Sequence, residues 1–344
     1  MNDKEWKSFI LSEIFDISST NSGIDKNKIK NKDINGNNPY ITRTDKNNGI
    51  DGFITEQDYE LNNGNSITIG LDTQTVFYQP HSFYTGQNIQ ILTNDYLNKY
   101  NGLFLVNLLK IVLEKFNWGG NGATLSRLKN SRIFIPINNE GEPDYEYMEN
   151  FMKNKEKELL NRYSNYLKNL NSQIGGGQLS NFNEISWAAF SLEELGEIFS
   201  GKDIYEDERI IGDIPYITAK SVNNGVGYYI SNMNNTYQSN SISINRNGAV
   251  GHAFYHPYNA LFSNDCRKFV INKNKYISLF IVNQIKLQKD KFSYGYKMGT
   301  ERLKKTKIML PVINNGDINY EYMEKYMINI EIKLIEKYLN FLNS

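Results

Sequence analysis

Short apolar runs, separated by Gly, Asn and Pro, recur along the chain at the length of β-strands. Apolar and small polar residues alternate in NSITI at residues 65–69 and in NSISI at residues 240–244. Alternation with a period of two is typical of a strand that buries one face. The denser apolar segments LFLVN at 103–107 and LFIVN at 279–283 predict buried helices. The pattern therefore predicts globular domains of mixed short strands and helices.

The two halves of the chain repeat one series of segments in the same order. PYIT stands at residues 39–42 and again at residues 215–218, an offset of 176 residues. Other matching pairs are WKSF at 6–9 and WAAF at 187–190, NNG at 47–49 and 223–225, FYQP at 77–80 and FYHP at 254–257, and YEYME at 145–149 and 320–324. Each copy also runs through residues 122–136 or 298–311, which we expect to form a Gly-rich loop followed by a strand. The chain is thus predicted to be an internal duplication.

Each copy ends in a segment with the spacing of one long amphipathic helix. Apolar residues recur every three or four positions through residues 145–174 and 320–344. The candidate interface residues of the two stripes are Met148, Met152, Leu159, Tyr163, Leu170, Met323, Met327, Ile330, Leu334 and Phe341. One alternative is that each stripe packs on its own domain. We favour the other, in which the helices pair as an antiparallel coiled coil across a pseudo-two-fold axis.

The expected fold class is α/β, or more strictly α+β, with two tandem homologous domains. Their expected bounds are 1–144 and 187–319, followed by helices at 145–174 and 320–344, with a linker at 175–186. The Gly-rich stretch at 173–181 is the expected flexible connector within this arrangement.

Charge and cysteine content add two limits. The sequence has 38 basic and 38 acidic residues, so a nucleic-acid surface would have to be a local basic patch. The single cysteine, Cys266, cannot form an intramolecular disulfide, and the N-terminus lacks the apolar core of a signal peptide. The longest apolar stretch, at 103–113, is shorter than the roughly 18 residues of a membrane span. We therefore expect a cytoplasmic protein with no membrane partner.

Motifs of catalysis and metal binding are absent from the sequence, so we expect no catalytic residues, no metal and no cofactor on this chain. His81, His252, His256 and Cys266 do not have the spacing of zinc ligands. NNPY at 37–40 and DIPY at 213–216 resemble the Asn/Asp-Pro-Pro-Tyr loop of amino methyltransferases, but both lack the first proline. PYIT is more simply interpreted as part of a buried strand, and GGNG at 119–122 as a turn.

Basic residues recur at corresponding places in the two copies, which favours contact with DNA. Arg and Lys neutralise phosphates and can bind guanine edges, while Asn, Gln and Thr can read adenine or thymine. The candidate DNA-binding residues are Arg43, Thr44, Lys46, Gln79, Asn121, Arg127, Lys129, Lys220, Arg246, Arg267, Lys268, Lys297, Arg302, Lys304 and Lys305. Any one of them alone is more often a solvated surface charge. Their recurrence on Gly-flanked segments is what supports the set.

The duplicated order of these segments resembles the specificity subunits of type I restriction-modification systems, and more closely those of the BcgI-like type IIB systems. The resemblance covers essentially the whole chain, although no single motif in it is specific. It implies two target recognition domains that each read one half of a split double-stranded DNA target. It also implies that the helices form an antiparallel spacer that docks methyltransferase (modification) and restriction subunits, which would carry AdoMet and Mg²⁺.

Three functions remain open from the sequence. The leading one is a non-catalytic specificity subunit, and the second is a stand-alone DNA-binding protein, such as a regulator or a decoy. The third is a self-contained DNA adenine methyltransferase. Copurification with a modification subunit separates the first two, and AdoMet binding by the isolated chain would favour the third.

Overall fold

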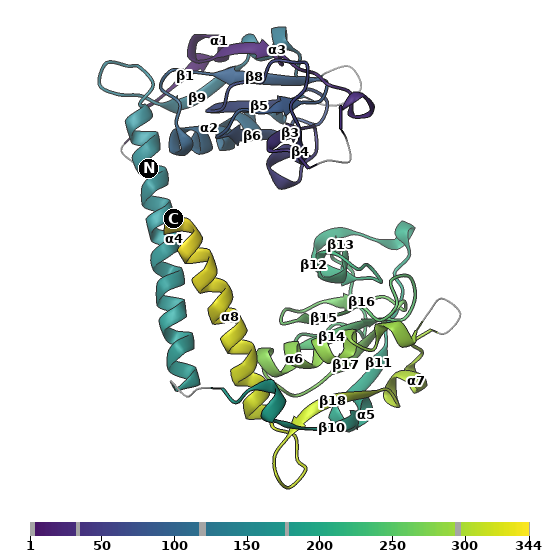
Figure 1. Cartoon of the computed structure of the whole chain (residues 1–344). Coiled ribbons are helices and arrows are strands. Elements are labelled where there is room, and N and C mark those ends of the chain that lie inside the picture. Colours follow the sequence, from purple (N-terminus) through teal and green to yellow (C-terminus); the bar gives the residue numbers. More distant parts are fainter. Residues whose placement is uncertain (1–3, 32–34, 117–121, 176–178, 293–296, 344) are drawn as a thin grey trace. The chain divides into compact units, whose positions relative to one another are not determined.

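The computed structural model describes residues 4–31, 35–116, 122–175, 179–292 and 297–343. The chain divides into two compact units, Met1–Asn161 and Arg162–Ser344. We call the globular parts of these units the first and the second domain (Figure 1). Within the described residues, no helix has the length and apolar character needed to cross a membrane.

The first domain contains nine strands and three helices among its described residues, followed by the long helix α4. They are β1 (Trp6–Ile10), α1 (Leu11–Ile14), β2 (Asp16–Ser19), β3 (Asn38–Ile41), β4 (Ile50–Ile54), β5 (Ser66–Gly70), β6 (Val76–Gln79), β7 (Tyr84–Thr85), β8 (Ile89–Thr93), α2 (Lys99–Leu113), α3 (Leu125–Lys129), β9 (Arg132–Pro136) and α4 (Tyr145–Ile174).

The strands form three sheets. A four-stranded antiparallel sheet has the order β2-β8-β5-β6, and a two-stranded sheet pairs β1 with β9. A three-stranded sheet has the order β4-β3-β7, in which β3 and β7 are parallel. The mostly antiparallel pairing agrees with the predicted α+β class.

The second domain repeats this topology strand for strand. Its elements are β10 (Ser186–Ser191), α5 (Leu192–Leu195), β11 (Glu197–Ser200), β12 (Ile211–Ile217), β13 (Val226–Ile230), β14 (Ser241–Asn245), β15 (Ala253–His256), β16 (Leu261–Phe262), β17 (Cys266–Val270), α6 (Lys275–Lys286), α7 (Thr300–Lys304), β18 (Lys307–Val312) and α8 (Tyr320–Asn343). The sheet orders are β11-β17-β14-β15, β13-β12-β16 and β10-β18. The internal duplication predicted from the sequence is thus confirmed in the fold.

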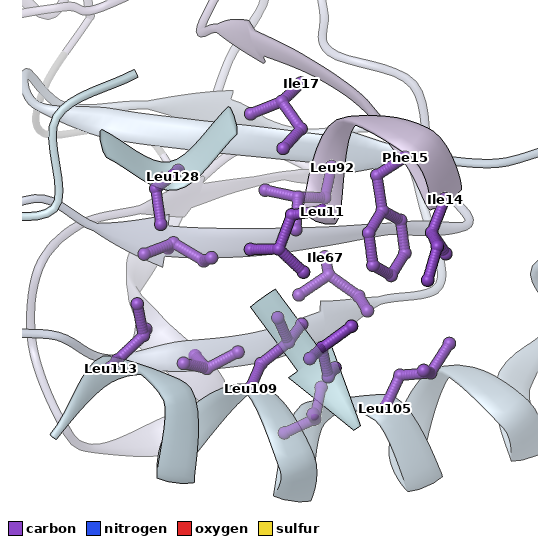
Figure 2. Packing of buried hydrophobic residues seen from close by; sticks show 14 of the residues in the cluster. Leu11, Ile14, Phe15, Ile17, Ile67, Leu92, Leu105, Leu109, Leu113 and Leu128 are labelled. Atoms are coloured by element: carbon purple, nitrogen blue, oxygen red, sulfur yellow. The ribbon is translucent and has the colours of Figure 1, made fainter. Parts of the chain in front are cut away.

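The core of the first domain lies between α2 and the four-stranded sheet. Leu105, Leu109 and Leu113 project from α2 toward Ile67 on β5 and Leu92 on β8 (Figure 2). All five side chains are buried, because the apolar run of α2 covers the apolar face of the alternating strands. The predicted helices at 103–107 and 279–283 and the predicted strands at 65–69 and 240–244 are all confirmed.

One element differs from the prediction. The segments after Gly122 and Met298 were expected to be loops leading directly into strands, but each contains a short helix, α3 or α7. Leu128 and Leu303 anchor these helices in the two cores. A single buried leucine in a five-residue helix gives too little periodicity to be recognised in the sequence.

The start of each long helix packs on its own domain. Met148 of α4 and Met323 of α8 are fully buried in the cores of the first and second domain, and Met152 and Met327 pack beside them. The prediction that these four residues belong to a helix-pairing stripe is therefore wrong, and the alternative is correct for the first turns. At these first turns the apolar side chains are buried against the helix's own domain, so they cannot also pack against the other long helix.

Further along, within the second unit, the end of α4 contacts α8. Leu170 is 1% exposed and lies in a cluster with Ile328 and Ile332 of α8. The Tyr166 hydroxyl donates a hydrogen bond of 3.1 Å to Glu331, and the rings of Tyr163 and Tyr338 are 5.9 Å apart. Residue numbers rise along α4 as they fall along α8, so these contacts are antiparallel. Leu159, Tyr163, Leu334 and Phe341 are mainly exposed, and Ile330 is half-buried.

The expected connector at residues 173–181 falls only partly within the described chain. Helix α4 extends to Ile174, and residues 179–181 are described, whereas residues 176–178 are outside the described residues.

A buried polar cluster supports the same turn in both domains. In the first domain Gln79 donates from Nε2 to the Thr68 hydroxyl and to the Asn48 carbonyl, each over 3.1 Å. In the second, His256 takes the place of Gln79, with its Nε2 2.8 Å from the Ser243 hydroxyl. The turns begin with NNG, and Asn48 and Asn224 both have positive φ. Burial lowers the pKa of His256 to about 4, so the ring is neutral at pH 7.

The first prediction concerns the helix contact. Leu170→Ala should lower the free energy of unfolding by about 2–4 kcal/mol, because it removes a buried side chain between two helices. Leu334→Ala is the matched control and should change it by less than about 0.5 kcal/mol, since Leu334 is 63% exposed. Urea denaturation followed by circular dichroism measures both. Equal effects of the two changes would contradict the assignment of Leu170 as the buried contact.

The second prediction concerns pH. The pKa of His256 is lower in the folded state than the roughly 6.5 of an unfolded chain, so below that pH the unfolded state binds a proton first. Stability from this group is therefore present above about pH 6.5 and is lost as pH falls toward 4. Replacing His256 with Gln, the residue at this position in the first domain, should remove about 2 kcal/mol of the stability loss between about pH 7 and 5. An identical loss in both proteins, measured by urea unfolding at each pH, would refute the assignment.

Candidate nucleic-acid interface

Several turns of the first domain meet at one end of its sheets. The parallel pairing of β3 with β7 continues beyond the strands, where the amide of Gly86 donates to the Ile41 carbonyl over 2.8 Å. The amide of Leu71 donates to the Asn88 carbonyl over 2.9 Å, and that of Ala123 donates to Leu71 over 3.0 Å. We call this surface the first loop end; it consists of residues 42–46, 71–75, 86–88 and 122–124.

Side chains at the first loop end are polar and include both signs of charge. Arg43 is exposed and forms an ion pair with Asp72. Asp72 also accepts a hydrogen bond of 3.4 Å from the Asn88 amide. Lys46 is exposed, and Thr44 is half-buried and accepts a hydrogen bond from the Lys46 amide. The structure thus brings three of the candidate residues onto one surface.

The second domain builds an equivalent surface from equivalent hydrogen bonds. The amide of Ser263 donates to the Ile217 carbonyl over 2.9 Å, and that of Arg246 donates to the Asp265 carbonyl over 2.8 Å. In addition, Asn245 donates from its side chain to the Lys220 carbonyl over 2.9 Å. This second loop end consists of residues 218–222, 246–251 and 263–265. It carries the candidates Lys220 and Arg246, whereas the candidate Lys297 lies just before α7.

Lys220 lies near an exposed aromatic side chain. Its Nζ is 5.6 Å from the centre of the Tyr228 ring, and the Arg209 guanidinium is 4.1 Å from the same ring. A cation over an aromatic face is attracted to the ring and keeps its positive charge, while its side chain is held in place. The surface beside the second loop end therefore combines two cations with an aromatic ring, a combination suited to nucleic acid.

Hydrogen bonds from three candidate arginines hold the segments next to α3 and α7; one of these arginines is buried and the other two are exposed. Arg267 is 4% exposed and donates from Nε to the Thr300 hydroxyl over 2.7 Å, which ties β17 to α7. Arg127 donates to the Gly122 carbonyl and Arg302 to the Lys297 carbonyl, in each case five residues back along the chain. These contacts position the segments that enter α3 and α7.

Two candidates are buried within the domains instead of facing outward. Gln79 is 2% exposed and is used by the polar cluster described above. Lys268 is 7% exposed, with its Nζ 3.4 Å from the Thr236 carbonyl and 5.1 Å from the Phe199 ring. Direct base contact by either residue, as expected from the sequence, does not agree with this burial.

Three further candidates lie away from the loop ends. Lys129 lines a groove with Glu13 and Thr93, at the opposite end of β8 from Asn88. Lys304 forms an ion pair of 2.8 Å with Glu301 within α7, a helix that also contacts α5. Lys305 lines a groove of the second domain with Lys291 and Lys307. The candidate Asn121 is outside the described residues.

The residues that pair with the candidates could not be recognised in the sequence. Asp72 and Asn88 hold Arg43 at the first loop end, and Thr300 holds Arg267 in the second domain. Their only signal was their position next to the matched strands, because short polar residues are common in every turn of this chain.

The tyrosines of the two NPY-like motifs are buried inside the fold. Tyr40 is 3% and Tyr216 is 1% exposed. Tyr40 donates to the Ile24 carbonyl over 2.7 Å, and the Tyr216 hydroxyl accepts from the Ile204 amide over 3.0 Å. Burial, together with the charges of Asp51 and Asp25, raises the pKa of Tyr40 to about 12. The interpretation of PYIT as a buried strand is confirmed.

Metal-ligating side chains do not gather in groups of three or more in the part of the chain that the structure describes. Cys266 is fully buried, and burial raises the pKa of its thiol to about 12. The absence of a cofactor on this chain stays a prediction.

Comparison with known proteins bears on both domains. Residues 3–165 and 184–340 each match the family described as the type I restriction modification DNA specificity domain. The chain is 33% identical over 337 residues to the "Type II restriction enzyme BgcI specificity subunit S.BcgI" of Heyndrickxia coagulans, covering 96% of both chains. It is also similar in fold to the crystal structure of a type I restriction-modification system S subunit from M. genitalium, with a TM-score of 0.52 and 16% identity, covering 100% of this chain and 94% of that one. The chain therefore belongs to the type I restriction modification DNA specificity family, as a specificity subunit that contains two copies of the domain.

Proposed function

We propose that each loop end reads one half of a split DNA target. The observation that carries the proposal is that two equivalent backbone frameworks present different side chains. Arg43 and Lys46 stand in the first domain where Ala219 and Val222 stand in the second. Different side chains on equivalent turns favour different base sequences. The target is therefore asymmetric and bipartite.

The charges of the loop ends suit this role. Lys46 and Lys220 are placed to contact phosphates, which fix the register of a protein on DNA. Arg43 is held by Asp72, so its guanidinium has a defined direction before DNA arrives. A pre-oriented arginine suits bidentate recognition of a guanine edge.

Partner subunits complete the proposed activity. We expect methyltransferase and restriction subunits to dock on the long helices, where Leu159, Leu334 and Phe341 leave large apolar side chains exposed. AdoMet and Mg²⁺ would be bound by those subunits, so this chain contributes recognition and no catalysis. Its place would be the cytoplasm, where the DNA substrate is found.

The third prediction tests the loop ends directly. Lys46→Ala and Lys220→Ala, made together in the full chain, should weaken binding to every duplex and reduce the slope of log affinity against log salt by about two, one per lost phosphate contact. Fluorescence anisotropy at several salt concentrations measures this, with the chain alone and with its copurified partner subunits.

The matched control for this experiment changes two lysines elsewhere in the same protein. Lys304→Ala with Lys305→Ala removes the same charge away from the loop ends and should leave the slope unchanged. If the control lowered the slope while the loop-end change did not, the DNA interface would lie on the α7 side and the proposal would be wrong.

A further inference from the structure

Two arginines, Arg246 and Arg267, lie close together in the second domain, and neither is part of an ion pair among the described residues. In the register of the sheet, Ile244 pairs with Arg267, and Arg246 is two residues beyond Ile244. Arg246 follows the end of β14, but its amide donates to the Asp265 carbonyl over 2.8 Å, so the pairing continues by one residue and places Arg246 on the same side as Arg267.

The two arginines differ in what they can still bind. Arg267 is held by the Thr300 hydroxyl and by the carbonyls of Asn264 and Cys266. Arg246 is half-buried, and its buried Nε has no hydrogen-bond partner among the described residues. Arg246 is therefore the member of the pair with donors available for a ligand, while Arg267 adds fixed positive charge behind it.

Nearby acid offsets this charge only in part. Asp265 is the nearby acid, but it is exposed, and its carboxylate accepts a hydrogen bond of 2.5 Å from the Asn247 side chain. Burial, and then the charge of Arg246, lower the pKa of Arg267, and an arginine so placed still remains protonated at pH 7. Like charges held together and partly desolvated are costly unless an anion compensates them.

The first domain lacks this arrangement although its backbone is the same. Leu71 occupies the position of Arg246 and makes the same amide hydrogen bond, to Asn88 instead of Asp265. Gln90 occupies the position of Arg267, next to Ser19 as Arg267 is next to Ser200. The arginine pair is thus a property of one domain, added to the shared framework.

We propose that Arg246, supported by Arg267, binds a backbone phosphate of the DNA half-site that the second domain reads, and that the first domain has no counterpart of this contact. The inference rests on the proposed function, because it takes the second loop end to face DNA. The second domain would then hold its half-site through a phosphate contact that the first domain lacks at the corresponding position.

The fourth prediction tests this contact with Arg246→Ala in the full chain. Binding should weaken about tenfold on every duplex, specific or not, as expected for loss of a charge-assisted hydrogen bond. The slope of log affinity against log salt should fall by about one. Arg246→Lys keeps the charge and should keep the slope. Because the Arg246 side chain has no hydrogen bond within the described protein and its charge lies near that of Arg267, the alanine variant should unfold at the same urea concentration as the unchanged chain or at a slightly higher one.

Lys273→Ala is the control, since Lys273 follows the opposite end of β17 and lies 3.8 Å from the Tyr320 ring. It removes one positive charge from the same domain and should change neither affinity nor slope. An unchanged slope for Arg246→Ala would overturn the inference. A loss of affinity seen only on duplexes with one particular base pair would also overturn it, because that pattern would indicate base reading. Failure of the unchanged chain to bind any duplex, both alone and with its copurified partner subunits, would instead refute the proposed function itself.

Discussion

The short parallel pairing between β3 and β7, repeated between β12 and β16, is the constraint on which the candidate interface depends. Each pairing spans two residue pairs and is extended by one backbone hydrogen bond, from Gly86 to Ile41 or from Ser263 to Ile217. It joins the three-stranded sheet to the turn that enters β8 or β17. Without this pairing, the turn after PYIT and the turn that enters β8 or β17 would not meet on one surface.

This framework separates the part of the domain that is shared from the part that varies. The hydrogen bonds that hold the loop ends are made largely by backbone atoms, so the side chains are released to differ between the copies. Arg43 with Asp72 marks the first loop end, and Arg246 with Arg267 marks the second. A duplicated fold can in this way present two unlike surfaces without a change in its core.

Much of the fold could be predicted from the sequence, because the duplication supplied each pattern twice. The strands around PYIT and the helices at 103–107 and 279–283 are examples. The long helices were harder, since an apolar stripe does not say what covers it: Met148 and Met323 pack on their own domains, whereas Leu170 contacts α8.

The candidate site was predicted only in part. Position in the chain identified Arg43 and Lys220, but it could not distinguish them from Lys268, which the sheet buries, or from Lys304, which pairs with Glu301. Charge recurrence gives the neighbourhood of a site. Which charges face outward depends on strand register and on contacts between turns far apart in sequence.

The most direct test of the account is to sequence the methylated adenines in the genome of the source organism, with and without the gene for this chain. If the two loop ends read different DNA, one methylated sequence should disappear with the gene, and it should consist of two different half-sites of about three or four base pairs, separated by about six uncontacted base pairs. A contiguous sequence, or two identical half-sites, would contradict the central claim that the two loop ends read different DNA.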